Sequence, residues 1–105
     1  MDAPSSATKI PRMNVRFCID PDTGQPHCAA HGVEEQEARG VLERPLEDRV
    51  GSHGSRVAVG RTSEGRYLRI VYVPDPEPGS VFVVTAYELG PKAKGALRRR
   101  LRKKR

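Results

Sequence analysis

The middle of this chain runs through one helical pattern and three strand patterns, and that order restricts the possible folds. Residues 31 to 45 carry apolar side chains at helical spacing, and Pro45 ends the pattern. Residues 55 to 61, 66 to 73 and 81 to 87 follow, rich in Val, Ile, Tyr and Phe and separated by short turns. One helix beside an antiparallel meander predicts a small α+β domain.

Weaker patterns extend this domain on both sides. Residues 13 to 19 alternate between apolar and polar and predict a first strand, while residues 27 to 31 predict a short helix that Gly32 ends. Residues 46 to 50 are a further candidate for an edge strand, and a last helix begins at Gly90-Pro91. We therefore expect an antiparallel sheet of about four strands, two short N-terminal helices packed on one face, and a basic C-terminal helix.

Length and composition bound the organisation of the chain. Its 105 residues suffice for one domain, and its apolar residues are concentrated in the middle. We expect a disordered segment over residues 1–11, an α+β domain over 12–91 and a basic helix or tail over 92–105. No secretory signal or membrane-spanning run is present, so the cytoplasm is the expected compartment and Cys18 and Cys28 are expected to be reduced.

Positive charge is concentrated at the C-terminus. Residues 92 to 105 contain nine Lys or Arg and no acidic residue, whereas residues 1 to 91 contain ten basic and thirteen acidic residues. Such a segment predicts an arm that binds phosphates or an acidic partner; the alternative is a tail that only keeps the protein soluble. The candidate nucleic-acid-binding residues are Lys92, Lys94, Arg98, Arg99, Arg100, Arg102, Lys103, Lys104 and Arg105.

Three arginines on the predicted strands are candidates for binding a phosphate in a reaction. Arg61 and Arg66 flank one hairpin turn, and Arg69 lies in the middle of a strand. A guanidinium group can bind two phosphate oxygens and can stabilise the charge of a phosphorus transition state. Strand alternation puts Tyr67 and Arg69 on the same side, away from the residues expected to pack under the helices. The alternative is that these arginines only keep exposed strands soluble.

Two side chains are candidates for proton transfer. Tyr87 lies at the end of the last strand, where it could stack on a base or act with Lys92 at a leaving oxygen. It could equally cover the rim of the core. His53 lies in a Gly-Ser-His-Gly turn and is a candidate general base, although an exposed turn residue fits it as well.

A compact group of possible metal ligands lies near the N-terminus. His27, Cys28 and His31 are close in sequence, and Cys18 could complete a zinc set, but the paired spacing of zinc knuckles is absent. A buried thiol and a helix-capping histidine explain the group too, and we predict neither a metal nor a cofactor. The chain also lacks a Gly-rich phosphate loop, a Gly-x-Ser-x-Gly elbow and a carboxylate cluster for two metals. A nuclease of this composition would therefore use the RNA 2′-OH as its nucleophile.

Three groups of short motifs lie within about residues 13 to 92. They are His31-Gly32-Val33 with Glu37-Ala38 and Leu42-x-x-Pro45, Gly60-Arg61-Thr62 through Tyr72, and Val83-Val84-Thr85-Ala86-Tyr87. These motifs resemble those of BrnT-like toxins, a family of the RelE/ParE-like group of bacterial toxin–antitoxin systems. The resemblance implies a small α+β fold, RNA cleavage that blocks translation, and neutralisation by an antitoxin encoded alongside. It also places Arg61, Arg66 and Tyr87 near the active face of the family.

Two functional hypotheses follow, together with the possibility of a purely structural protein. The first is a toxin that is a metal-independent endoribonuclease, with Arg61, Arg66 and Arg69 at the phosphate and Tyr87 or His53 in proton transfer. Its partners would be RNA, including ribosome-associated mRNA, and a cognate antitoxin. The alternative is a non-catalytic module that binds nucleic acid or another partner through its basic tail.

Overall fold

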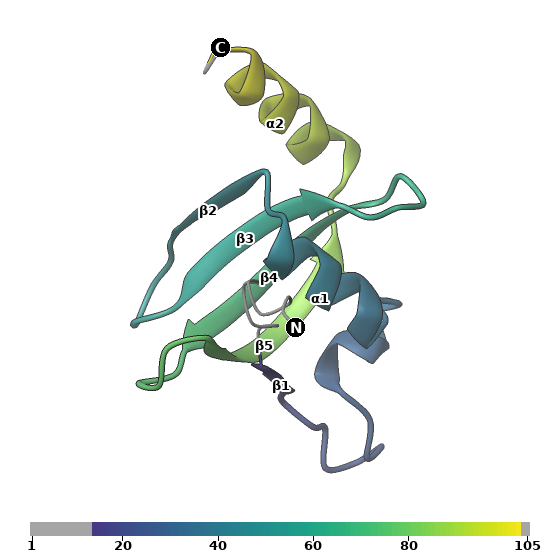
Figure 1. The fold of residues 1–105 in the computed structure, drawn as a ribbon. Coiled ribbons are helices and arrows are strands. Elements are labelled where there is room, and N and C mark those ends of the chain that lie inside the picture. Colours follow the sequence, from purple (N-terminus) through teal and green to yellow (C-terminus); the bar gives the residue numbers. More distant parts are fainter. Residues whose placement is uncertain (1–13, 104–105) are drawn as a thin grey trace, which may run out of the picture.

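The computed structural model describes residues 14–103, which form a five-stranded sheet with two helices and one 3-10 turn (Figure 1). The predicted disordered segment, residues 1–11, lies outside the described residues. The strands are β1 (Asn14–Phe17), β2 (Glu47–Val50), β3 (Arg56–Arg61), β4 (Tyr67–Pro74) and β5 (Ser80–Glu88). The 3-10 turn is η2 (His27–His31), and the helices are α1 (Glu35–Glu43) and α2 (Pro91–Lys103). The predicted α+β class is therefore confirmed.

The sheet is mixed, and the expectation of about four antiparallel strands was wrong in this respect. Its strand order is β1-β5-β4-β3-β2, with β2 to β5 antiparallel and β1 parallel to β5. Residues 46 to 50 do supply the edge strand β2. The strand β1 is parallel because the chain passes through η2, α1 and three strands before β5 runs alongside it. Only such a long connection allows parallel pairing.

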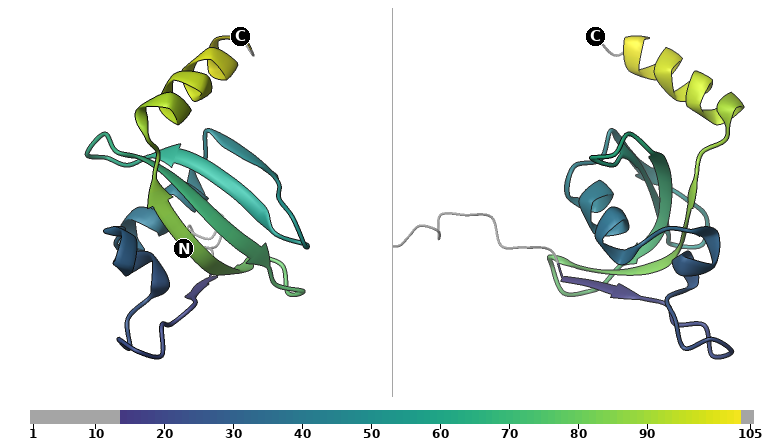
Figure 2. Two further views of the ribbon diagram at one scale, coloured as in Figure 1. Left: turned by 180° about the vertical axis from the view of Figure 1, so that it is seen from behind. Right: turned by 90° about the vertical axis from the view of Figure 1, so that its right-hand side faces the viewer.

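Only one of the two expected N-terminal helices packs over the sheet. Helix α1 contacts β3 and β4, whereas η2 runs alongside β5 (Figure 2). The turn η2 is only five residues long because Gly32 follows it in the left-handed conformation, with φ 74°. Its one buried residue, Cys28, reaches the core.

The main core lies between α1 and the sheet. Ala38, Val41 and Leu42 of α1 are buried against Leu68 and Ile70 of β4. Helix and strand approach closely at one glycine, because a Cβ built on Gly60 would lie 2.9 Å from Cγ1 of Val41. The sequence pattern therefore predicted this face of the sheet correctly.

A second, smaller cluster lies on the opposite side of the sheet. Leu97 of α2 is fully buried against Val59 and Leu89, and partly buried Tyr67 and Val57 adjoin them. Helix α2 begins at Pro91, as predicted, and leans over one end of this side (Figure 2). We call this side the open face. Among its residues are Val57, Val59, Arg61, Tyr67, Arg69, Val71, Thr85 and Tyr87, which are register partners across β3, β4 and β5. No helix within residues 14–103 is long and apolar enough to cross a membrane.

Candidate nucleic-acid interface

Arg69 and Tyr87 form the centre of the open face. They are register partners on β4 and β5, so their side chains emerge next to each other. An Nη1 hydrogen of Arg69 is donated to the Tyr87 hydroxyl over a long 3.5 Å, and the guanidinium carbon lies 5.8 Å from the ring centroid. The contact is of the cation–π type and fixes an arginine beside a phenol. Tyr67 and Arg69 lie on the same face of β4, as the sequence predicted.

His31 joins this pair from a different element. It is the last residue of η2, and its imidazole lies edge-on to Tyr87 with 6.2 Å between ring centroids. His27 lies edge-on to His31 at 5.5 Å on the other side. Sequence reasoning considered His31 only as a metal ligand or a cap. The only signal available there was its spacing of four from His27, which gives no hint of Tyr87.

Two buried polar atoms on the open face have no hydrogen-bond partner within residues 14–103. They are Nε of Arg69 and Oγ1 of Thr85, which lies one cross-strand row away from Tyr87. No carboxylate forms an ion pair with Arg69 among the described residues. A guanidinium group without a counter-charge is suited to an anionic ligand.

A second cationic group lies next to the first. The guanidinium carbons of Arg61 and Arg98 lie 5.6 and 5.9 Å from the Tyr67 ring centroid. Arg61 comes from the end of β3 and Arg98 from α2, and Tyr67 is the register partner of Arg61. Within residues 14–103 neither arginine has an ion-pair partner, and both are exposed. The open face therefore carries three arginines held by two tyrosines.

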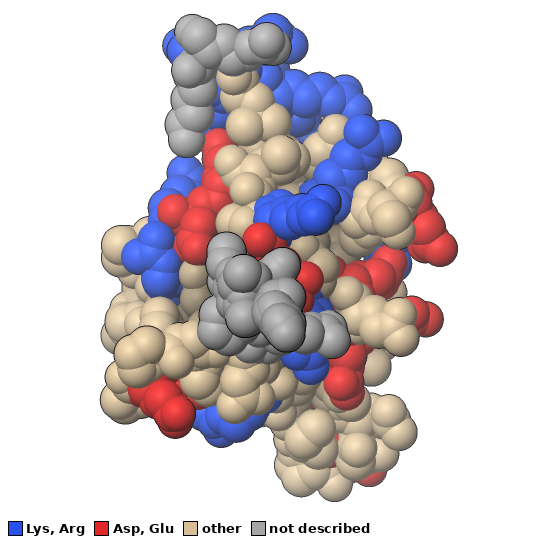
Figure 3. Space-filling model, in the orientation of Figure 1, with Lys and Arg blue, Asp and Glu red and all other residues tan. Residues whose placement is uncertain are grey.

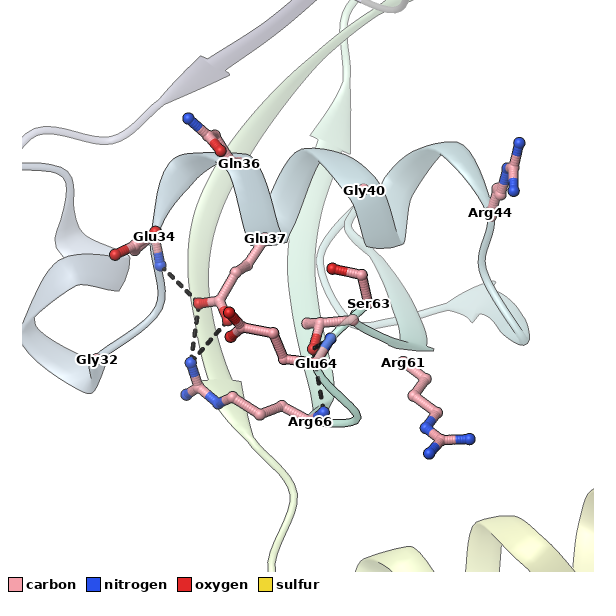
Figure 4. Close-up of a pocket in the computed structure, with 11 residues that line it drawn as sticks. Gly32, Glu34, Gln36, Glu37, Gly40, Arg44, Arg61, Ser63, Glu64 and Arg66 are labelled. Atoms are coloured by element: carbon pink, nitrogen blue, oxygen red, sulfur yellow. Dashed lines mark hydrogen bonds and ion pairs between the residues drawn. The ribbon is translucent and has the colours of Figure 1, made fainter.

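Arg66 does not belong to this group, contrary to the prediction. Its Nη1 donates to both carboxylate oxygens of Glu37 at 2.9 and 2.8 Å, and its Nη2 lies 3.4 Å from Glu88. Figure 4 shows Arg66 directed towards Glu37, with Arg61 extending in another direction. Both residues line a cleft of about 540 Å³ between α1 and the β3–β4 hairpin. Alternation explains the difference, because flanking one turn does not put two residues on the same face.

His53 is also remote from the arginines. It lies in the turn between β2 and β3, with φ 57°, at the opposite end of β3 from Arg61 (Figure 1). His53 is therefore not beside Tyr87 or the open-face arginines. The histidine that lies beside Tyr87 is His31.

The basic tail is a helix as far as Lys103, and one of its arginines forms an ion pair with the sheet. Arg100 donates to both carboxylate oxygens of Glu47 at 2.8 and 2.9 Å, and this bond raises the pKa of Arg100. The remaining basic side chains give α2 its positive surface (Figure 3). Of the predicted tail residues, Lys104 and Arg105 lie outside the described residues.

The possible metal ligands His27, Cys28 and His31 do not face one common site, because Cys28 is buried in the core and His31 is on the surface. Cys28 is 1 % exposed, and burial raises the pKa of its thiol, whereas His31 is on the surface beside Tyr87. Between residues 14 and 103 no three His, Cys, Asp or Glu side chains are grouped so that they could hold a metal ion.

No protein-family model, no curated protein and no solved structure matches this chain. The resemblance to BrnT-like toxins therefore stays a prediction from short motifs. What the chain can do chemically has to be inferred from the residues of the open face.

Proposed function

We propose that this protein is a toxin of the metal-independent endoribonuclease type that cuts RNA on its open face. The observation that carries the proposal is the contiguous row of His31, Tyr87 and Arg69. The row combines two groups that can exchange protons with one cation that forms no ion pair among residues 14–103. RNA cleavage without a metal needs these components, because the nucleophile belongs to the substrate.

The proposed reaction uses each of the three side chains once. The imidazole of His31 accepts the proton of the RNA 2′-OH, whose oxygen then attacks the adjacent phosphorus. The bond from phosphorus to the 5′-oxygen breaks, leaving a 2′,3′-cyclic phosphate, and the Tyr87 hydroxyl donates a proton to the departing oxygen. Arg69 stabilises the negative charge that develops on the phosphoryl oxygens.

The surroundings of this row suit a polyanionic substrate. Arg61 and Arg98 lie on the same face, and the basic helix α2 borders it. RNA, including ribosome-associated mRNA, would be held with strongly salt-dependent affinity. The proposal also includes a cognate antitoxin protein, as the resemblance to toxin–antitoxin systems implies.

The test is inducible expression in a bacterial host, combined with cleavage assays on purified protein. Wild type should arrest growth and cut RNA, and Arg69→Ala, His31→Ala and Tyr87→Phe should each lower the cleavage rate by about 10²-fold or more. Arg44→Ala is the matched control, because it removes one exposed arginine at the end of α1, the helix that packs on the opposite side of the sheet from the row. Cleavage by Arg69→Ala at the wild-type rate would contradict the proposal.

A non-catalytic RNA-binding module is the second candidate. It is favoured by the mixture of tyrosines and arginines on a sheet face, which suits base stacking and phosphate binding without chemistry. It is also favoured because no carboxylate of the described residues forms a hydrogen bond with His31. Folded wild-type protein that binds RNA tightly but releases no cyclic phosphate would establish this alternative.

A further inference from the structure

Two positively charged groups approach the ring of Tyr67 from different elements. The guanidinium groups of Arg61 and Arg98 both approach its ring, at 5.6 and 5.9 Å from the centroid. An anion that binds near the Tyr67 ring would be attracted by both positive charges. No carboxylate among the described residues forms an ion pair with either of them.

The position of Arg98 is fixed by its neighbours on α2. Leu97 is fully buried, and Arg100 forms its two bonds with Glu47, whose side chain is 6 % exposed. Leu97 and Arg100 anchor the helix on either side of Arg98, and this places Arg98 beside Tyr67, with its guanidinium carbon 5.9 Å from the ring centroid. Arg100 also neutralises Glu47, the acidic residue that shares the open face, so that Glu47 does not compete for the pair of arginines.

We propose that Arg61, Tyr67 and Arg98 form a second phosphate site, which binds the phosphate next to the one at Arg69 on single-stranded RNA. This inference rests on the proposed function, because it takes Arg69 as the site of the first phosphate. Tyr67 and Arg69 are two residues apart on one face of β4, so that their Cα atoms lie roughly 6.6 Å apart and the two proposed sites are neighbours along the strand. Neighbouring phosphates of an extended single strand are spaced similarly, so one strand running along β4 can reach both sites.

The site also defines the substrate class. Each guanidinium group can donate two hydrogen bonds to phosphate oxygens, and the partly exposed tyrosine rings beside them can contact the sugar or base that follows. A substrate with two consecutive phosphates should gain affinity over one with a single phosphate. A rigid duplex cannot lay one strand flat along a single β-strand with its bases against the sheet, so the preference is for single-stranded RNA.

The experiment compares a dinucleotide that has one internal phosphate with a trinucleotide that has two. Both carry 2′-deoxy sugars, which lack the attacking hydroxyl, so binding is measured without cleavage by NMR titration of the whole protein. Wild type should bind the trinucleotide about tenfold more tightly than the dinucleotide, as expected for one added charge-assisted contact. In the Arg61→Ala/Arg98→Ala variant the two affinities should become nearly equal.

A matched control separates the site from the general positive charge of the tail. Arg99→Ala/Arg102→Ala removes the same charge from exposed positions of α2 and should retain the tenfold gain. Loss of the gain in this control, or its persistence in the Arg61→Ala/Arg98→Ala variant, would overturn the inference. A second variant, Arg61→Lys/Arg98→Lys, keeps the charge and should still lose most of the gain, because lysine lacks the planar fork.

The two proposals fail in distinguishable ways. Cleavage that depends on Arg69 together with an unchanged trinucleotide gain in Arg61→Ala/Arg98→Ala would remove only the second phosphate site. A gain that requires Arg61 and Arg98, in a protein that never cleaves RNA, would remove the nuclease and keep the site. The NMR spectra also show whether each variant is folded, so loss of binding cannot be confused with loss of structure.

Discussion

Arg66 donates hydrogen bonds to both carboxylate oxygens of Glu37, and this pair joins the β3–β4 hairpin to the first turn of α1. Glu37 also accepts a hydrogen bond from the backbone N–H of Glu34, at 3.1 Å, as part of a capping box. One carboxylate therefore caps the helix and fixes the hairpin. Arg66, which the sequence suggested for the reaction, has its donors directed at the scaffold.

Arg66→Ala should destabilise the fold without lowering RNA cleavage directly. The pair is partly buried, with side-chain exposures of 28 % for Arg66 and 14 % for Glu37. We expect the free energy of unfolding to fall by about 1–2 kcal/mol in urea titrations, since a charged partner is left unpaired. The control is Arg49→Ala on the exposed edge strand, which should change stability by less than about 0.5 kcal/mol. Equal effects of the two variants would contradict the role of the pair.

Two glycines, Gly60 of β3 and Gly40 of α1, should respond oppositely to alanine. Gly60→Ala places a Cβ 2.9 Å from Val41 and should cost about 1–3 kcal/mol of unfolding free energy. Gly40 lies within α1 with nothing near its Cβ position, so Gly40→Ala should stabilise by about 0.5–1 kcal/mol. Thermal unfolding of both variants measures the difference. A stabilising Gly60→Ala would show that α1 can move away from β3.

The attachment of α2 should depend on Leu97. Leu97→Ala leaves a cavity against Val59 and Leu89. It should lower the free energy that holds α2 against the sheet by about 2–4 kcal/mol. Hydrogen exchange of the α2 amides should accelerate, and RNA affinity should fall although no charge has changed. Leu46→Ala, at a leucine that is 41 % exposed, serves as the control and should leave α2 protected. Unchanged exchange in Leu97→Ala would mean that the Arg100–Glu47 pair alone retains the helix.

Tyr72 should make the fold sensitive to alkaline pH. Burial, together with the 2.6 Å hydrogen bond that its hydroxyl donates to Asp48, raises the pKa of Tyr72 from 10.0 to about 12. The unfolded chain loses this proton at lower pH than the folded protein does. The resulting stability is therefore complete below pH 10 and is lost as the pH rises towards 12.

Urea unfolding across this pH range measures the effect. Tyr72→Phe should have a flatter stability profile above pH 10 than wild type has. Tyr67→Phe is the control, because it leaves the bond between Tyr72 and Asp48 in place. Identical profiles of wild type and Tyr72→Phe would contradict the assignment.

Local patterns determined the elements of this protein. Apolar spacing, Pro45 and Pro91 were enough to place α1 and the start of α2, and strand alternation put Tyr67 and Arg69 on one face. Such features depend on residues a few positions apart, whose spacing relates directly to the 3.6-residue and two-residue periods.

Only the tertiary structure decided which elements meet. Arg66 binds a carboxylate 29 residues away, Arg100 one that is 53 residues away, and His31 lies beside Tyr87 because η2 runs along β5. The parallel pairing of β1 likewise joins strands from opposite ends of the domain. No periodicity in the chain encodes these contacts, since they follow from the packing of whole elements. The sequence by itself thus determined the strands that carry the candidate site, and the packing of η2 and α2 against those strands decided which other residues join it.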